Sequence, residues 1–283
     1  MTAAGAHALR PIRGPAALGS DLRRMLHLTV TLAVMEFKLR FFDSVLGYLW
    51  QLMRPLMLFG VLYLVFTEFV RISGGVSHYQ AILLTGIVLF TFFSDATMGS
   101  VTSVYDREAL VRKIEFPRLV VPLAVLLTAY FNLALNLIAV LVFVLAAGVH
   151  PQVEWLFLPV LLALLGVFAA GLSMLLSALY VRFRDVKPIW EVMLQVIFYG
   201  SPILYVLEKV PRPRLQHLIP ILNPLATILV QARHTLIDPA APNAWDAVGG
   251  APRLLIPGAI LFGLFALGFW VFNREAPRIA EEL

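Results

Sequence analysis

The sequence has no cysteine, few charged residues and no ATP-binding loop. Without cysteine, the chain forms neither disulfides nor thiolate metal sites. Charged residues make up 14% of the chain and hydrophobic residues 60%, whereas soluble domains carry about 25% charged residues. A phosphate-binding loop needs a Lys after its second Gly, but the nearest match, Gly14 to Gly19, continues with Ser20 and Asp21. These absences exclude a water-soluble protein, and they exclude ATP hydrolysis through such a loop.

The hydrophobic residues gather in long runs separated by short loops. A helix rises about 1.5 Å per residue, so roughly 20 apolar residues cross a hydrocarbon core of about 30 Å. Residues 1–19 lack the apolar core of a signal peptide and are expected to form a disordered cytoplasmic tail. Residues 20–283 are expected to form one all-α transmembrane domain, with six membrane-spanning helices at about 45–70, 81–103, 120–147, 155–181, 189–207 and 254–272.

The basic residues predict how these helices are oriented. Sixteen of the 22 Lys and Arg residues fall on the side of the membrane that holds the N-terminus, and six fall on the other side. Short loops rich in Lys and Arg remain in the cytoplasm. The sequence therefore predicts that both termini are cytoplasmic. The same topology accounts for the net charge of +5, so the charge does not indicate nucleic-acid binding.

Three segments depart from a plain bundle of spanning helices. Residues 20–43 predict an amphipathic helix in the inner interface, with Arg23, Arg24 and His27 on its polar side. The inner loop 105–119 is dense in charges, and a short helix that stops before Pro117 fits it. The Ser201-Pro202 pair interrupts the fifth span, and further prolines follow. Since broken backbone at membrane depth needs protein or water around it, we expect short re-entrant helices at about 214–221 and 224–237 on the outer side.

Polar and aromatic side chains inside the spans are candidates for a transport path. An ionised carboxylate is costly at membrane depth, so Asp95 should face protein or water. Aromatic rings can stack on the C–H faces of sugars and permit sliding. The alternative for each ring is ordinary packing or contact with lipid. The candidates are Phe59, Tyr63 and Phe66 in the first span, Phe90, Phe92 and Phe93 in the second, and Phe198, Tyr199 and Tyr205 in the fifth.

Several motifs, in register on the six spans, give the chain a resemblance to a known family. It resembles permeases of the ABC-2 polysaccharide exporter family over nearly everything from Glu36 to Phe272. Any one motif is weak, but the set in order is specific. The motifs are Phe37 to Trp50 with Arg54-Pro55-Leu56, Leu110 to Arg118 with Pro122, Arg184-Asp185-Val186, Ser201 to Tyr205, and Asn223-Pro224-Leu225.

This resemblance implies a homodimer in the bacterial plasma membrane that binds two copies of a separate ATPase. The ATPase would hold ATP and Mg, and the dimer would move a lipid-linked glycan outward, such as an O-antigen, a galactan or a teichoic acid. The first and fifth spans would line the channel. The implied outer gate contains Pro202, Pro220, Asn223 and Pro224, and the implied ATPase-coupling residues, on cytoplasmic coupling helices, are Glu108, Leu110, Arg112, Lys113, Glu115, Phe116, Arg118, Arg184 and Asp185.

The implied coupling residues also have two ordinary structural explanations that need no ATPase. The loop 105–119 carries ordinary cytoplasmic charge, and Asp185 can cap the next helix while Arg184 binds lipid phosphate. Two other classes of membrane protein are alternatives. An enzyme acting on lipid-linked sugars would need paired carboxylates at the membrane face, and a proton-coupled transporter would need several ionisable groups within the membrane and internal repeats. The sequence has none of these patterns, so an ABC-2 exporter of a drug or lipid is the closest rival.

Overall fold

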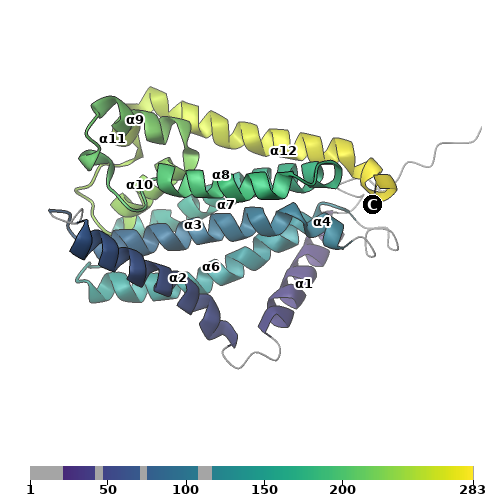
Figure 1. Ribbon diagram of the computed structural model, residues 1–283, viewed down its shortest axis with the longest axis horizontal. Coiled ribbons are helices and arrows are strands. Elements are labelled where there is room, and N and C mark those ends of the chain that lie inside the picture. Colours follow the sequence, from purple (N-terminus) through teal and green to yellow (C-terminus); the bar gives the residue numbers. More distant parts are fainter. Residues whose placement is uncertain (1–21, 42–46, 71–74, 108–116, 283) are drawn as a thin grey trace, which may run out of the picture.

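The computed structural model describes residues 22–41, 47–70, 75–107 and 117–282, and every regular element in these ranges is a helix. Figure 1 shows an elongated bundle whose long helices run roughly side by side. In chain order the elements are α1 (Leu22–Phe41), α2 (Gly47–Leu64), η1 (Val65–Phe69), α3 (Tyr79–Val101), α4 (Ser103–Asp106), α6 (Val120–Ala146), η2 (Val153–Phe157), α7 (Leu158–Arg182), α8 (Val186–Gly200), η3 (Leu207–Lys209), α9 (Pro213–Leu222), α10 (Pro224–Leu236), α11 (Ala244–Val248), η4 (Ala251–Leu254) and α12 (Leu255–Glu282).

Five helical segments of the described chain are long and apolar enough to cross a membrane, and there are six if one bent pair counts as a span. This confirms the predicted all-helical membrane fold. The five are Leu49–Phe69, Tyr79–Val101, Val120–Ala146, Val153–Arg182 and Ala251–Ala276. The bent pair is α9 and α10, and the chain bends by 107° between them. The two helices predicted at 214–221 and 224–237 are therefore present, at Pro213–Leu222 and Pro224–Leu236.

The predicted span at 189–207 is interrupted at Ser201 and Pro202, as expected, but its helix is shorter than a membrane crossing. α8 ends at Gly200 after 15 residues. At about 1.5 Å per residue it reaches about 22 Å, which is less than a hydrocarbon core of about 30 Å. The backbone at Ser201 is extended, with ψ 151°. The apolar residues after Pro202 are buried in the protein and are not part of α8. Hydropathy alone therefore placed the end of this helix too late.

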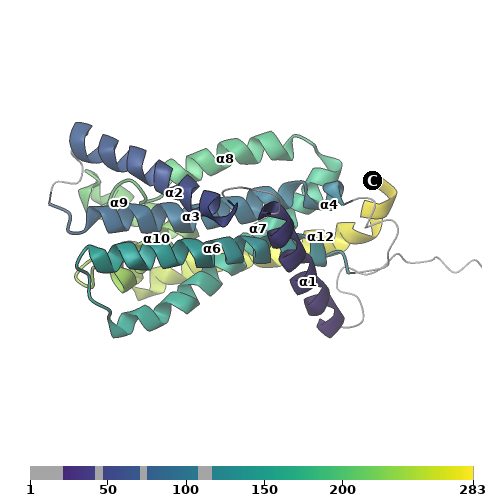
Figure 2. The same ribbon diagram turned by 90° about the horizontal axis from the view of Figure 1, so that it is seen from below.

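α3 is the central helix of the bundle. Of its most apolar window, 72% is buried, against 11% for the α2 span and 17% for the span that includes α12. Figures 1 and 2 show α3 running through the middle, and α2, α6, α7, α8 and α10 all pack against it. A hydrophobic core joins side chains of these helices, including Phe93, Leu133, Leu165 and Leu225. α2 and α12 lie at the periphery, so lipid or another protein must cover their apolar faces.

α7 and α12 approach each other more closely than side chains would allow. A Cβ atom built on Gly268 would lie 2.0 Å from the carbonyl oxygen of Gly171. A Cβ built on Gly171 would lie 2.6 Å from the Cα of Phe265. Small residues at such crossings permit helices to pack tightly within a membrane. This glycine contact fixes the last helix of the chain against the bundle.

α1 lies oblique to the long helices, near α4 and the C-terminus (Figures 1 and 2). It packs on α6 through buried Met25 and Ala33, and the rings of Phe37 and Phe131 meet edge to face at 5.4 Å between centroids. Its start at Leu22 and end at Phe41 agree closely with the predicted 20–43. The side chains of Leu22 and Leu26 are exposed, so part of the apolar surface of α1 is not covered by the described chain.

Candidate functional site

The break after α8 is closed by hydrogen bonds to the chain itself. The Ser201 hydroxyl donates to the carbonyl oxygen of Ile197 at 2.6 Å, and the Tyr79 hydroxyl donates to that of Leu204 at 2.8 Å. Ile203 is fully buried against Gly86 of α3, where there is no side chain to exclude it. Two carbonyl groups on either side of Pro202 are thus paired with side chains of the protein, as broken backbone at membrane depth would require.

Asn223 holds the bend between α9 and α10. Its side-chain oxygen accepts hydrogen bonds from the backbone N–H groups of Leu225 and Ala226 at 3.1 and 3.4 Å, which caps α10. Its amide nitrogen donates to the Ser201 hydroxyl oxygen at 2.9 Å. One side chain therefore joins the break after α8 to the α9–α10 bend, although 22 residues separate Ser201 and Asn223.

The prolines of this bend are accommodated by a nearby hydroxyl. Pro224 lacks an N–H, so the carbonyl oxygen of Pro220 loses its usual helical donor. The Thr227 hydroxyl donates to that carbonyl at 2.6 Å instead. The four residues predicted for the outer gate, Pro202, Pro220, Asn223 and Pro224, thus lie in connected segments at the end of the bundle opposite α4.

Eight of the predicted path residues are only partly buried or exposed. Phe59 stacks on Tyr63 in α2 at 5.6 Å, and Phe90 of α3 meets Phe198 of α8 at 4.9 Å. Tyr199 is 67% exposed. Figure 2 shows α2 and α8 on the same side of α3. Phe66 and Tyr205 are partly buried, as is Asp95 on α3.

Phe92 and Phe93 lie inside the bundle instead. Phe92 packs against Tyr130 at 4.6 Å, and Phe93 stacks on Phe168 at 5.2 Å. Both side chains are buried, and Phe93 has no exposed surface. Their contacts within the described chain are those of packing residues, unlike those of Phe90, which precedes them by two and three positions.

The opposite end of the bundle holds the described part of the predicted coupling region. Six predicted residues, Glu108, Leu110, Arg112, Lys113, Glu115 and Phe116, lie outside the described residues. Arg118 is 2% exposed. The Arg184 guanidinium lies over the ring of Tyr105 at 3.8 Å and near that of Tyr180 at 5.1 Å, which are cation–π contacts. Asp185 is exposed and makes no capping hydrogen bond to α8, so the capping part of that alternative is wrong.

One ion pair at this end was not anticipated from the sequence. Arg107, the last described residue before 108–116, pairs with Glu36 of α1. Arg23, Arg24 and His27 lie on the exposed side of the same helix. The pair joins α1 directly to the charged loop. The sequence does contain a Glu in the predicted interfacial helix, which could indicate an ion pair. It does not indicate the Arg partner, which is 71 residues away in the chain.

Comparison with known proteins gives one family and a consistent set of relatives. The family model described as ABC-2 type transporter matches residues 27–237. The chain is 26% identical to an O-antigen export system permease protein of Klebsiella pneumoniae over 264 residues, which is 93% of this chain and 97% of that protein. It is 28% identical to the protein of the same name in Myxococcus xanthus over 217 residues, 77% and 83% of the two chains. It is 22% identical to a polysialic acid transport protein of Escherichia coli over 209 residues, 71% and 78%.

Proposed function

The chain belongs to the ABC-2 type transporter family, and on that premise we propose that it is the permease of an exporter of a lipid-linked cell-surface polysaccharide. The observation that indicates the substrate is the similarity to O-antigen export permeases, which extends over 93% of this chain. It is a transport subunit and not a catalytic one. The family implies a separate ATPase, which would supply the energy by hydrolysing ATP.

We propose that the chain works as a homodimer with two copies of that ATPase, which hold ATP and Mg. α2 and α8 favour this arrangement because they leave apolar side chains exposed, including Met57, Val61, Ile189, Val192 and Val196. The homodimer would lie in the bacterial plasma membrane with the termini on the cytoplasmic side.

The ATPase would dock at the end of the bundle that holds α4. Arg107 and Pro117, the described residues on either side of 108–116, lie at that end, and Arg184 and Asp185 are exposed there. The Glu36–Arg107 ion pair ties α1 to this loop, so movement of the docked ATPase would reach the membrane through both elements. Apolar anchors such as Leu110 and Phe116 would hold the contact while the surrounding charges orient it.

The glycan would pass along the face formed by α2, α3 and α8. Phe59, Tyr63, Phe90, Phe198 and Tyr199 offer partly exposed rings on this side. A flat apolar ring can stack on the C–H face of a sugar without stripping water from the hydroxyls. Phe66 lies in η1, which continues α2, Asp95 lies on α3, and Tyr205 follows α8 toward the gate. The gate would be the linked segments at Pro202, Pro220, Asn223 and Pro224.

The proposed function is tested by replacing the chromosomal gene with variants and measuring surface polysaccharide. Loss of the chain should leave lipid-linked glycan inside the cell. The variants Tyr63→Ala and Tyr199→Ala should reduce export several-fold while membrane levels of the complex stay unchanged, since these rings are partly exposed. Phe262→Ala is the matched control, because Phe262 is also exposed but lies on α12. Normal surface glycan in the deletion strain, with loss of drug or lipid efflux instead, would favour the rival exporter.

The docking assignment is tested separately by co-purification of the chain with its ATPase. The variants Leu110→Asp and Phe116→Asp place a charge in an apolar contact and should weaken the complex by a few kcal/mol. Leu218→Asp is the control, because Leu218 is exposed on α9 at the other end of the bundle. ATPase yield that is undiminished by both loop variants would mean that the loop does not dock it.

A further inference from the structure

A large apolar groove lies between α7, α10, α11 and the start of α12, at the end of the bundle that holds the predicted gate, here called the gate end. Its volume is about 810 Å³, which is within the range of about 300–1,000 Å³ of typical ligand sites. Trp245 of α11 lines the groove and is 52% exposed. The apolar lining includes Leu164, Ile228, Leu255 and Phe262.

The groove runs along the first half of two candidate membrane spans. Leu161 and Leu164 line it from the span Val153–Arg182. Residues between Leu255 and Phe262 line it from the span Ala251–Ala276. At about 1.5 Å per residue, the groove follows α12 for about 10 Å, roughly a third of a hydrocarbon core of about 30 Å. In a bilayer the groove therefore faces the acyl chains of one leaflet, the one at the gate end.

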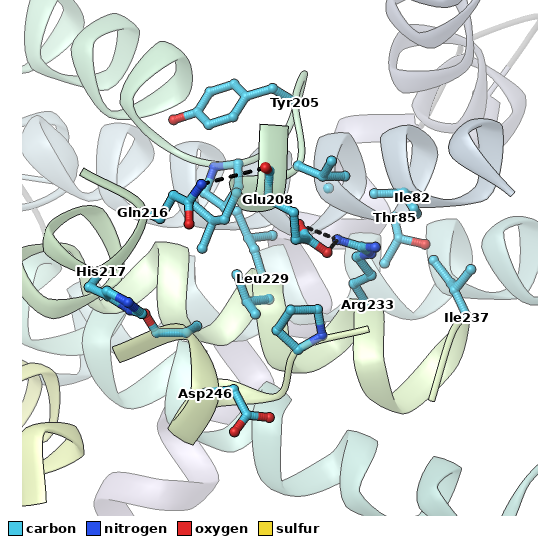
Figure 3. Close-up of a pocket in the computed structure, with 17 residues that line it drawn as sticks. Ile82, Thr85, Tyr205, Glu208, Gln216, His217, Leu229, Arg233, Ile237 and Asp246 are labelled. Carbon is cyan, nitrogen blue, oxygen red and sulfur yellow. Dashed lines mark hydrogen bonds and ion pairs between the residues drawn. The ribbon is translucent and has the colours of Figure 1, made fainter. Parts of the chain in front are cut away.

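α10 separates this groove from a smaller cavity of different chemistry. Figure 3 shows the cavity, which has a volume of about 150 Å³ and contains the ion pair of Glu208 and Arg233. Leu229 and Arg233 line the cavity, whereas Thr227 and Gln231 line the groove. Helix residues four apart share a face, and residues two apart point in nearly opposite directions. α10 thus turns its charged face away from the groove, and no charged side chain is among the described residues that line the groove.

The polar side chains of the groove are already used within the protein. The Thr227 hydroxyl donates to the carbonyl oxygen of Pro220 at 2.6 Å. The side-chain oxygen of Gln231 accepts from the backbone N–H of Ala244 at 2.8 Å, and its amide nitrogen donates to the Thr235 hydroxyl at 3.3 Å. A polar ligand would find few partners here. A flexible apolar chain can instead fill the groove through van der Waals contacts, which an empty groove would forfeit.

The end of the groove at α11 and η4 has the chemistry of a membrane interface. Tryptophan is enriched where lipid meets water, and the exposed ring of Trp245 lies there. Arg253 is exposed between two lining residues, Ala251 and Leu254, and makes no ion pair within the described chain. Asp246, the nearest acidic residue in the sequence, lines the cavity instead. A guanidinium beside an apolar groove matches the phosphate and the acyl chain of a phospholipid.

We propose that the groove is a binding site for one phospholipid of the leaflet at the gate end, with an acyl chain in the groove and the phosphate near Arg253. Pro224 and Thr227 line the groove at the start of α10, so the lipid supports the bend between α9 and α10 from the membrane side. The inference goes beyond the proposed function, because it requires only that the chain spans a membrane.

The test uses the purified full-length chain in dodecyl maltoside, titrated with phosphatidylethanolamine that carries a diazirine in one acyl chain. Light cross-links the bound probe, and mass spectrometry locates the labelled residues. Labelling within 254–262 should saturate at about one lipid per chain and should fall when unlabelled phosphatidylethanolamine is added, because one site is filled. Leu267 and Trp270 are exposed farther along α12 and serve as the reference for ordinary lipid contact. Their labelling should rise without saturating.

Gly258→Phe fills the groove from within. Gly258 lines it, and a Cβ built there has nothing within 4 Å. The added ring should reduce groove labelling about tenfold, because it takes the place of the acyl chain. Gly263→Phe is the matched control on the same helix, since its Cβ position is equally open but Gly263 does not line the groove. It should leave groove labelling unchanged.

Arg253→Gln is a second variant that tests the site should Gly258→Phe fail to fold. Arg253 is exposed, so the substitution leaves the packing intact, and loss of the phosphate partner should lower groove labelling several-fold. Groove labelling that does not saturate, or that survives both variants, overturns the site. Labelling that is displaced by a polyprenyl phosphate and not by unlabelled phosphatidylethanolamine assigns the groove to an isoprenoid lipid and overturns the phospholipid. Labelling of Leu267 and Trp270 without any in the groove means that protein covers it, such as a second copy of the chain, and this also overturns the site.

Discussion

At the residue scale, Asn223 does most to hold the gate end together. Its oxygen caps α10, and its nitrogen reaches the Ser201 hydroxyl across the break after α8. Ser201 in turn donates to the last turn of α8 at Ile197. A change in the direction of α8 would therefore be passed to α10 through two hydrogen bonds. These bonds link α8, which carries the exposed ring of Tyr199, to the bend.

Two substitutions separate the roles of Asn223. Asn223→Ala removes both the cap and the Ser201 contact and should cost about 1–2 kcal/mol of stability. Asn223→Asp keeps an acceptor for the cap and loses only the donor, so it should cost about half as much. The fraction of purified chain that remains monodisperse after heating measures both. Equal losses in the two variants would show that the Ser201 bond, rather than the cap, dominates.

The candidate residues show what a sequence can predict at this scale. The sequence could predict that the chain is interrupted near four residues, because proline and Asn-Pro favour turns and helix ends. These are Pro202, Pro220, Asn223 and Pro224, and their role as a gate stays a prediction. The aromatic set was less predictable. Successive helix residues point about 100° apart, so Phe92 lies nearly opposite Phe90 and turns into the core. Phe93 lies closer to the face of Phe90, but it is buried because it packs between Phe168 and Trp190. The Glu36–Arg107 pair could not be predicted, because it depends on how α1 folds back on the bundle.

At the element scale, helix lengths follow hydropathy in α3, α6 and α7 but not in α8. α3, α6 and α7 agree with their predicted spans within a few residues at each end. The segment 201–207 was assigned to a helix because it is apolar, yet Ile203, Leu204 and Val206 are buried in the core around α3. Hydropathy cannot distinguish lipid contact from protein contact. The π-helical turn at Val65–Phe69, which ends the first span, also gave no sequence signal.

The glycine contact between α7 and α12 gives a prediction at this scale. Gly268→Ala places a methyl group against the Gly171 backbone, where a Cβ would lie 2.0 Å from the carbonyl oxygen. The helices must separate, so the variant should lose about 1–3 kcal/mol and unfold at lower temperature. Gly263→Ala is the matched control on the same helix, because nothing lies within 4 Å of its Cβ position. It should be neutral, or more stable by about 0.5–1 kcal/mol. Equal behaviour of the two would refute the close crossing.

At the scale of the whole molecule, the two ends of the bundle differ in their chemistry. One end holds α4 and the C-terminus, and it carries Arg107, Arg182, Arg184 and Arg274. The other end holds the bend, the short helix α11 and the cavity. The division agrees with the charge pattern that predicts cytoplasmic termini. In the proposed exporter, one end of the bundle would bind the ATPase and the other end would release the glycan. α3 runs between these two ends.

The predicted orientation can be tested because the chain has no cysteine of its own. Single variants Lys113→Cys, Lys187→Cys and Lys209→Cys are expressed in cells and treated with a thiol reagent that does not cross membranes. Position 209 should react in intact cells, since Lys209 is exposed at the gate end of the bundle. Positions 113 and 187 should react only after the membrane is permeabilised, because positively charged loops stay inside. The unmodified chain is the control and should never be labelled. Labelling of position 113 or 187 in intact cells would invert the orientation and place the proposed gate on the cytoplasmic side.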